Sequence, residues 1–175
     1  EAEEVWLHDR QLKVRRVADG GTPAVMVHGL GGSSLNWTDL AYQMQGRLDS
    51  WALDLPGFGW SPPPRDGDYT PSGQAAAVRA LITEKIKEPV HLFGNSMGGA
   101  ISLTLAAQSP ELVRSLTLIS PALVGGRITR TNVHLPVLTV PGLGEKLVDS
   151  YAQASPERRV NTTIDACFGD TTRMS

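Results

Sequence analysis

Short apolar runs separated by glycine, proline and polar turns dominate the first 120 residues. The run 24–27 is continuous and lies between Pro23 and a glycine-rich segment, which is typical of a strand buried on both faces. Segments 51–53 and 90–93 also predict buried strands, and 112–119 predicts the next strand. We predict that these four segments are strands of one sheet.

Helical patterns lie between these strands. Residues 71–87 carry apolar side chains at helical spacing, 98–107 are small and apolar, and 35–44 fit a further helix. Before the first buried strand, segments 4–8 and 11–17 mix polar and apolar positions and predict an antiparallel edge hairpin. The alternation of strand and helix predicts an α/β fold with a mostly parallel sheet and helices on both faces.

The pattern of apolar and polar residues changes at residue 120. Beyond it, glycine and proline interrupt the pattern, and only 145–152 and 157–166 have helical character. We therefore divide the chain into residues 1–120, the N-terminal part of the core, and residues 121–175, the start of a helical lid.

The composition fits a globular domain, with 41% hydrophobic and 19% charged residues. The formal net charge is -2 and the basic residues are scattered, so nucleic acid is not an expected partner. Cys167 is the only cysteine, and no Cys and His pair has zinc-ligand spacing. We expect a small-molecule substrate and neither a metal nor an organic cofactor, and the oligomeric state stays open.

Apolar runs are all shorter than a membrane-spanning helix requires, since glycine, proline or a charged residue breaks each one. The acidic start, residues 1–4, lacks both a basic segment and an apolar stretch, which are the marks of a secretory signal. We therefore expect a cytoplasmic protein, although residue 1 is not Met and the start can be trimmed.

The candidate nucleophile is Ser96, in the sequence Gly-Asn-Ser-Met-Gly at 94–98. The pattern G-x-S-x-G lets the chain make a strained turn from strand to helix that exposes the serine hydroxyl. The motif alone is weak, but here a buried strand precedes it and a helix of small residues follows. The context favours a catalytic serine over a plain glycine turn.

A second glycine-rich segment, His-Gly-Leu-Gly-Gly at 28–32, directly follows the strand 24–27. A serine enzyme must stabilise an oxyanion, and two backbone N–H groups provide this, one after the nucleophile and one in this earlier loop. We predict that the N–H groups of Met97 and Leu30 form the oxyanion hole. Gly29, Leu30 and Asn95 are the predicted substrate-binding residues.

Together with Asp-Leu-Pro-Gly-Phe-Gly-Trp-Ser at 54–61, these two motifs resemble the α/β-hydrolase family in order and spacing over residues 1 to about 120. The resemblance implies that Asp54 ends a strand and shapes a loop rather than reacting. Serine at position 96, where some relatives place aspartate, argues against haloalkane dehalogenase and epoxide hydrolase chemistry. Asn95 resembles the residue before the nucleophile in hydrolases of carbon–carbon bonds, but esterases also carry it.

The family order is serine, then an acid, then a histidine that serves as the base. His134 is the only histidine after Ser96, and it lies in the predicted lid without an orienting carboxylate. The later acids are equally poor candidates for the acid of a triad: Asp149, Asp165 and Asp170. We expect the acid and the histidine to lie beyond residue 175, and the fragment alone to be inactive.

Three functions are compatible with these residues. The leading one is a serine hydrolase that acts on a carboxylic ester or a related carbonyl through an acyl-enzyme at Ser96. An alternative is a carbon–carbon bond hydrolase of the ring-cleavage-product type, suggested by Asn95. A third is a scaffold that kept the fold without the catalytic base.

Overall fold

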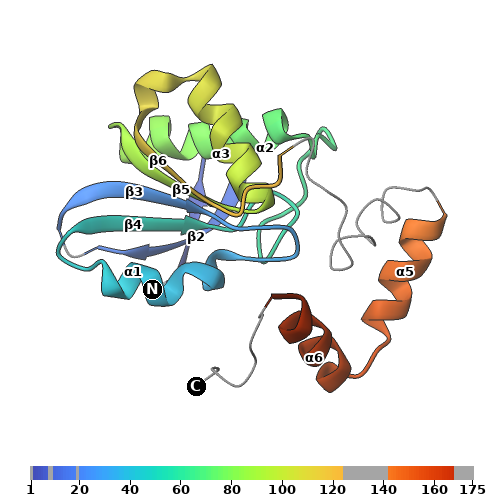
Figure 1. The fold of residues 1–175 in the computed structure, drawn as a ribbon. Coiled ribbons are helices and arrows are strands. Elements are labelled where there is room, and N and C mark those ends of the chain that lie inside the picture. Colours follow the sequence, from blue (N-terminus) through green and yellow to red (C-terminus); the bar gives the residue numbers. More distant parts are fainter. Residues whose placement is uncertain (1, 8–9, 19, 124–141, 168–175) are drawn as a thin grey trace. The chain divides into compact units, whose positions relative to one another are not determined.

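The structure, a computed structural model, describes residues 2–7, 10–18, 20–123 and 142–167 (Figure 1). The chain divides into two compact units, Glu1–Val124 and Gly125–Ser175. Each unit is described by itself. Residues 124–141, which include His134 and much of the predicted lid, lie outside the described residues, as does His8.

The first unit is built on one six-stranded sheet with the order β1-β2-β4-β3-β5-β6. Strands β3 to β6 run parallel to their neighbours within this group, whereas β1 and β2 are antiparallel to each other and β2 is antiparallel to β4. The mostly parallel sheet and the edge hairpin are therefore confirmed. The strands are β1 (Ala2–Trp6), β2 (Gln11–Val17), β3 (Thr22–Val27), β4 (Leu48–Leu53), β5 (Val90–Asn95) and β6 (Val113–Ile119).

Helices cover both faces of this sheet (Figure 1). One face carries η1 (Ser34–Trp37) and α1 (Thr38–Gln43), and the opposite face carries α2 (Pro71–Leu81) and α3 (Met97–Gln108). Short turns follow the latter two, a π-helical turn η2 (Ile82–Ile86) and a 3₁₀ turn η3 (Pro110–Leu112). The predicted two-sided α/β arrangement is confirmed.

The core lies on the two faces of β3, whose side chains alternate between them. Val25 and Val27 pack into the larger apolar cluster on the α2 and α3 side, whereas Met26 packs with Trp37 and Ala52 under η1 and α1. All three β3 side chains are completely buried. Each contributes about 1.5–3 kcal/mol relative to an exposed position, which explains why this strand reads as an unbroken apolar run.

Two predicted helices differ from the observed ones. The segment 35–44 begins with the 3₁₀ turn η1, and only six residues form α1. The segment 71–87 is α-helical only to Leu81, because the Thr83 hydroxyl donates to the Arg79 carbonyl (3.0 Å) and Lys87 N–H donates to the Ile82 carbonyl, five residues back (2.6 Å). Such side-chain competition and wide-turn hydrogen bonds convert the last turn into η2.

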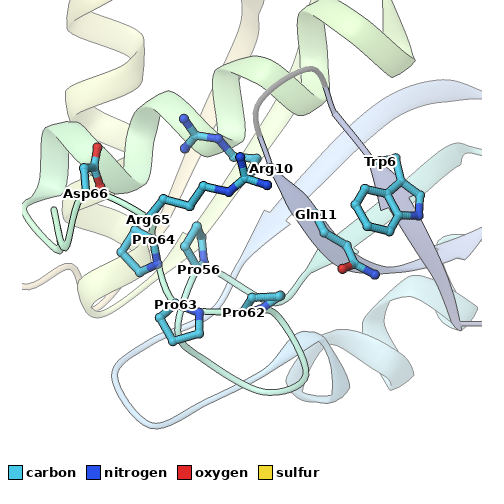
Figure 2. Close-up of a pocket in the computed structure, with 9 residues that line it drawn as sticks. All are labelled: Trp6, Arg10, Gln11, Pro56, Pro62, Pro63, Pro64, Arg65 and Asp66. Carbon is cyan, nitrogen blue, oxygen red and sulfur yellow. The ribbon is translucent and has the colours of Figure 1, made fainter.

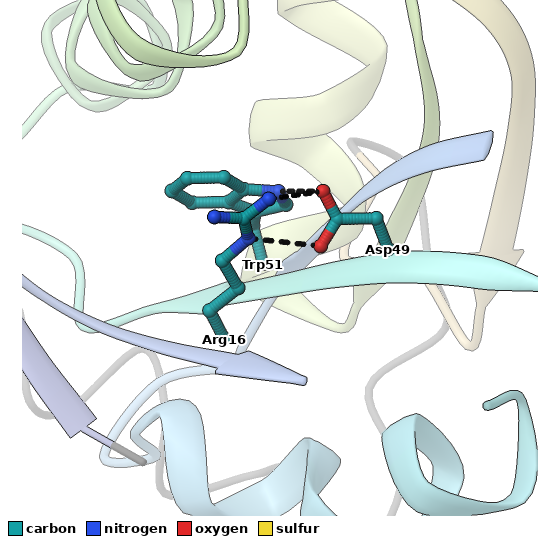
Figure 3. Close-up of polar contacts among 3 residues, drawn as sticks. All are labelled: Arg16, Asp49 and Trp51. Carbon is teal, nitrogen blue, oxygen red and sulfur yellow. Dashed lines mark hydrogen bonds and ion pairs between the residues drawn. The ribbon is translucent and has the colours of Figure 1, made fainter. Parts of the chain in front are cut away.

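The strands β2 and β4 are joined at the surface by Arg16, Asp49 and Trp51 (Figure 3). Arg16 forms a two-point ion pair with Asp49, at 2.9 Å and 2.8 Å, and its guanidinium lies 4.2 Å from the centre of the Trp51 ring. The Trp51 indole N–H donates to the same carboxylate (3.1 Å). These contacts fix the pairing of the hairpin with β4.

The second unit contains α5 (Leu143–Ala152) and α6 (Pro156–Cys167). The two helices predicted from the sequence are therefore present, and the Tyr151 hydroxyl of α5 donates to the Arg159 carbonyl of α6 (3.2 Å). Their role as a lid stays a prediction. Across both units, no helix among the described residues combines the length and apolar character that crossing a membrane requires.

Candidate active site

Ser96 occupies the turn between β5 and α3 with φ 50° and ψ -117°, a backbone conformation that a side-chain-bearing residue rarely adopts. Such a residue costs about 1–3 kcal/mol and persists only where its surroundings hold it. Here Ser96 N–H donates to the Ile119 carbonyl (3.0 Å), and the Ser96 carbonyl accepts from Gly99 N–H (2.9 Å) and Ala122 N–H (2.9 Å). The strained turn predicted from G-x-S-x-G is present.

The glycines on either side of Ser96 are required by close contact. A Cβ atom on Gly98 would lie 2.5 Å from the His28 carbonyl oxygen, and one on Gly94 would lie 2.5 Å from the Gly98 carbonyl oxygen. Backbone atoms on both sides leave no room for a side chain. The glycines thus let α3 pack directly against the ends of β3 and β5.

The glycine-rich loop after β3 meets this turn. A Cβ atom on Gly29 would lie 3.2 Å from Ser96 Cβ and 3.0 Å from Asn95 Oδ1, so the two predicted motifs are in contact. Within the loop, Gly32 N–H donates to the Gly29 carbonyl (3.0 Å) and closes a tight turn that contains Leu30.

The two predicted oxyanion donors are available for a ligand. Leu30 N–H makes no hydrogen bond to any residue that the structure describes. Met97 is the first residue of α3, so its N–H has no carbonyl partner within the helix. The N-terminal end of an α-helix carries a partial positive charge, and in α3 that charge lies at Met97. The structure thus brings the two predicted motifs together, with Leu30 directly after Gly29 and Met97 directly after Ser96 in the chain.

His28 is completely buried at the end of β3 and ties the loop to the next strand. Its Nε2 accepts from Leu55 N–H (3.0 Å), so the ring proton is on Nδ1, which donates to the Gly29 carbonyl (2.7 Å). Burial lowers the pKa of His28, and the Gly29 carbonyl and the Asp54 charge oppose that shift only in part. The imidazole and the Phe58 ring pack edge to face, with ring centres 5.6 Å apart and ring planes at 66°.

Asp54 follows β4 and is also completely buried. Its carboxylate accepts two backbone N–H groups, from Ser34 (2.6 Å) and from Trp60 (2.9 Å). Neither contact, nor the His28 contact with Leu55, was predicted from the sequence, since the partners lie 6 to 27 residues apart in no recognisable pattern.

Asn95 and His91 are hydrogen-bonded to residues of the neighbouring strand β6. The Asn95 amide donates to the Ile119 carbonyl (3.3 Å) of the neighbouring strand. His91 lies in β5 and is hydrogen-bonded to the Ser115 hydroxyl (2.7 Å). No described residue is hydrogen-bonded to the Ser96 hydroxyl. Within the described part of the chain, no cluster of His, Cys, Asp or Glu could hold a metal ion.

A surface pocket of about 330 Å³ lies between the β1–β2 hairpin and the proline-rich loop after β4 (Figure 2). Ser96, Leu30 and Met97 do not line it, so it is separate from the site described above. The sequence analysis did not anticipate it. The lining residues are Trp6, Arg10, Gln11, Pro56, Pro62, Pro63, Pro64, Arg65 and Asp66.

Comparison with known proteins assigns the family. A family model described as the alpha/beta hydrolase fold matches residues 22–168. The chain belongs to this family, and the resemblance inferred from the motifs is confirmed.

Two curated relatives and one solved structure are similar to the chain. Lipase 1 of Psychrobacter immobilis is 40% identical over 103 residues, which are 58% of this chain and 32% of the lipase. The dihydrolipoyllysine-residue acetyltransferase component of the acetoin cleaving system of Pseudomonas putida is 40% identical over 111 residues, 63% of this chain and 30% of that protein. The chain thus spans about a third of the length of these relatives.

Haloalkane dehalogenase DatA from Agrobacterium tumefaciens C58 shares the fold, with a TM-score of 0.74 and 24% sequence identity over 93% of this chain and 61% of that chain. At this level of identity the likeness extends to the fold alone. The chemistry must therefore be argued from the site.

Proposed function

We propose that this chain is part of a serine hydrolase that cleaves a carboxylic ester through an acyl-enzyme at Ser96. The observation that carries the proposal is the contact between the strained Ser96 turn and the Gly29 loop. Leu30 follows Gly29 and Met97 follows Ser96, and neither N–H is hydrogen-bonded to a residue that the structure describes, which supports a role for both as oxyanion donors. This is the arrangement that attack on a carbonyl carbon requires.

In the proposed reaction, Ser96 Oγ attacks the ester carbonyl and its proton passes to a base. The carbonyl oxygen takes the negative charge and accepts hydrogen bonds from Leu30 and Met97 N–H. When the tetrahedral intermediate collapses, the alcohol leaves with a proton from the protonated base and the acyl group stays on Ser96. Water then attacks the acyl-enzyme by the same steps in reverse and releases the acid.

The base is the missing part of this proposal. His28 and His91 are both engaged in other contacts, and neither is hydrogen-bonded to Ser96. We place the catalytic histidine and its acid outside the described residues, in line with the short span of this chain relative to the lipase and the acetyltransferase component.

The names of the relatives support acyl chemistry. The name of one relative is that of a lipase and the name of the other is that of an acetyltransferase component, so both names concern acyl groups. The carbon–carbon bond hydrolase was suggested only by Asn95, and the contact between the Asn95 amide and the Ile119 carbonyl accounts for that residue without a substrate. Ester hydrolysis is therefore the function that the site supports best.

Labelling with a fluorophosphonate tests the nucleophile. We expect the full-length protein that contains this chain to gain the mass of one phosphonyl group, and the Ser96→Ala variant to gain none. Ser72→Ala is the matched control, because Ser72 lies in α2, is exposed, and its hydroxyl accepts a hydrogen bond from the Gln108 side chain (3.3 Å). Turnover of p-nitrophenyl butyrate should fall at least about 1,000-fold in Ser96→Ala and stay unchanged in Ser72→Ala.

Two outcomes would count against the proposal. Undiminished turnover in a folded Ser96→Ala variant would remove Ser96 as the nucleophile. Turnover of a vinylogous diketone dienoate without any ester hydrolysis would favour the carbon–carbon bond alternative, and labelling of neither protein would favour the scaffold.

A further inference from the structure

A single buried carboxylate, that of Asp54, connects the segments that follow β3 and β4, and the first of these contacts the Ser96 turn. Asp54 Oδ1 accepts from Ser34 N–H (2.6 Å) at the start of η1, directly after the glycine-rich loop that follows β3. Its Oδ2 accepts from Trp60 N–H (2.9 Å) in the loop after β4. The aspartate is 0% exposed. A charged acceptor in such a place makes short, strong hydrogen bonds to backbone donors, because water does not compete for it.

The hydrogen bond to Ser34 fixes the far end of the segment that carries Leu30. The near end is fixed by Gly29, which contacts Ser96 and whose carbonyl accepts from both His28 Nδ1 and Gly32 N–H. Leu30 lies between these two anchors and has no hydrogen bond of its own among the described residues. Ser33 N–H also donates to the Asn36 side chain (2.8 Å), so contacts hold the chain on both sides of Leu30.

The position of Asp54 is itself fixed from several sides. Asp54 N–H donates to the Lys13 carbonyl (2.8 Å), and the Asp54 carbonyl accepts from the Ser61 hydroxyl (2.7 Å), which in turn accepts from Lys13 N–H (2.9 Å). Gly59 lies so close to the carboxylate that a Cβ atom there would be 2.5 Å from the Asp54 Cγ atom. The carboxylate has one available position, set by β2 and the loop 54–61.

We propose that Asp54 is a positioning residue for the oxyanion hole, holding the loop after β3 so that Leu30 N–H points at the reacting carbonyl. This inference rests on the proposed function of Ser96. An asparagine cannot accept both hydrogen bonds with separate oxygens. Its side chain has one acceptor oxygen and one NH₂ donor, whereas the Ser34 and Trp60 N–H groups both need an acceptor. One of the two loops then loses its anchor.

The test compares Asp54→Asn with Asp49→Asn in the full-length protein. Both changes remove one carboxylate charge from β4 or its end, but Asp49 pairs with Arg16 and Trp51 at the other end of the strand. The substrate is p-nitrophenyl butyrate, and the number of active sites is counted by complete fluorophosphonate labelling. We expect kcat per active site to fall about 10- to 100-fold in Asp54→Asn. The KM should change less than about 3-fold. The second-order rate of labelling should fall by a similar factor, since the phosphonyl oxygen uses the same donors. Asp49→Asn should keep both rates.

The thermal midpoint separates positioning from a merely structural role. If Asp54→Asn lowers the midpoint while kcat per labelled site stays at the wild-type value, Asp54 only stabilises the fold and the proposal is wrong. Should Asp54→Asn fail to fold, Gly59→Ala provides a second variant, because its methyl group displaces the carboxylate without removing it. An unchanged kcat per labelled site in Gly59→Ala would equally contradict the proposal.

Failure of the proposed function gives a different result. In that case the wild-type protein itself is not labelled at Ser96, and no comparison between variants is needed to see it. Labelling of the wild type with equal rates in Asp54→Asn and Asp49→Asn would leave Ser96 as the nucleophile and overturn only the positioning role.

Discussion

Strand β4 has an aspartate near each of its ends, and the two carboxylates bind different partners. Asp49, near the start of the strand, accepts hydrogen bonds from the side chains of Arg16 and Trp51 at the surface (Figure 3). Asp54, just beyond the other end, is completely buried and accepts only from backbone N–H groups, those of Ser34 and Trp60.

The difference follows from the topology of the sheet. Strands β3, β4 and β5 are parallel, so the loops that follow them meet at one edge, where a buried acceptor can join them. Near the start of β4, the partners of Asp49 are instead the side chains of Arg16, which is partly exposed to water, and of Trp51. We therefore expect one end of the strand to support the proposed site and the other end to contribute to stability alone.

The largest effect on stability is expected from Gly98→Ala at the edge that carries the site. The added methyl group would lie 2.5 Å from the His28 carbonyl oxygen, so α3 or β3 must shift, at a cost of about 3 kcal/mol. Gly46→Ala is the control just before β4. Its methyl group meets nothing within 4 Å, and only its positive φ of 74° adds cost, about 1 kcal/mol. Urea unfolding followed by circular dichroism measures both, and equal losses would contradict the difference between the two ends.

A smaller effect is expected from acid, through His28. Because burial lowers its pKa in the folded state, the unfolded chain binds a proton first as the pH falls below about 6.5. The free energy of unfolding should therefore decrease from pH 6.5 down to the lowered pKa of folded His28, by about 1.4 kcal/mol for each pH unit between the two values, and stay level below it.

This pH dependence is measured by urea unfolding at pH 7.5, 6.5, 5.5 and 4.5. His28→Gln removes the titrating ring, so the difference between wild type and variant isolates its contribution. Protonation would also place a hydrogen on Nε2 against Leu55 N–H and disturb the Gly29 loop. A difference that is constant across the pH range would show that His28 makes no such contribution.

The smallest effect is expected from Arg16→Lys at the other end of β4. Lysine keeps the charge but loses the two-point pairing with Asp49 and the stacking on Trp51, which together contribute about 1 kcal/mol at a partly exposed site. A thermal melt should show a midpoint lower by a few degrees, with kcat unchanged. A fall in kcat would show that this end of the strand also supports the site.

Much of the fold was predictable because the central strand β3 is buried on both faces. The runs that became β3 and β5 are apolar enough to indicate strands directly, and G-x-S-x-G predicted the strained turn at Ser96. Strand β6 was predicted as well, although none of its residues is buried. The start of β4 was missed, since Asp49 and Ser50 are polar. Their polarity is compatible with a strand only because Asp49 finds Arg16 across the sheet, a contact that spans 33 residues.

The residues of the candidate site were predicted from the sequence, but the hydrogen bonds that hold its loops were not. Ser96, Met97, Leu30 and Gly29 were named from two motifs, and the structure brings them into one place, while their catalytic roles stay a prediction. The contacts of Asp54 with Ser34 and Trp60, and of His28 with Leu55, could not be predicted. No spacing rule relates a carboxylate to a backbone N–H in another loop, because the backbone N–H is common to every residue except proline.

By itself, the sequence determined which segments are strands and where glycine must stand, since apolar periodicity and the absence of a side chain are local properties. Only the tertiary structure decided which loops share an edge, which carboxylate is buried, and which N–H groups are left for a ligand. Those depend on strand order, and strand order follows from burying apolar faces that lie far apart in the chain.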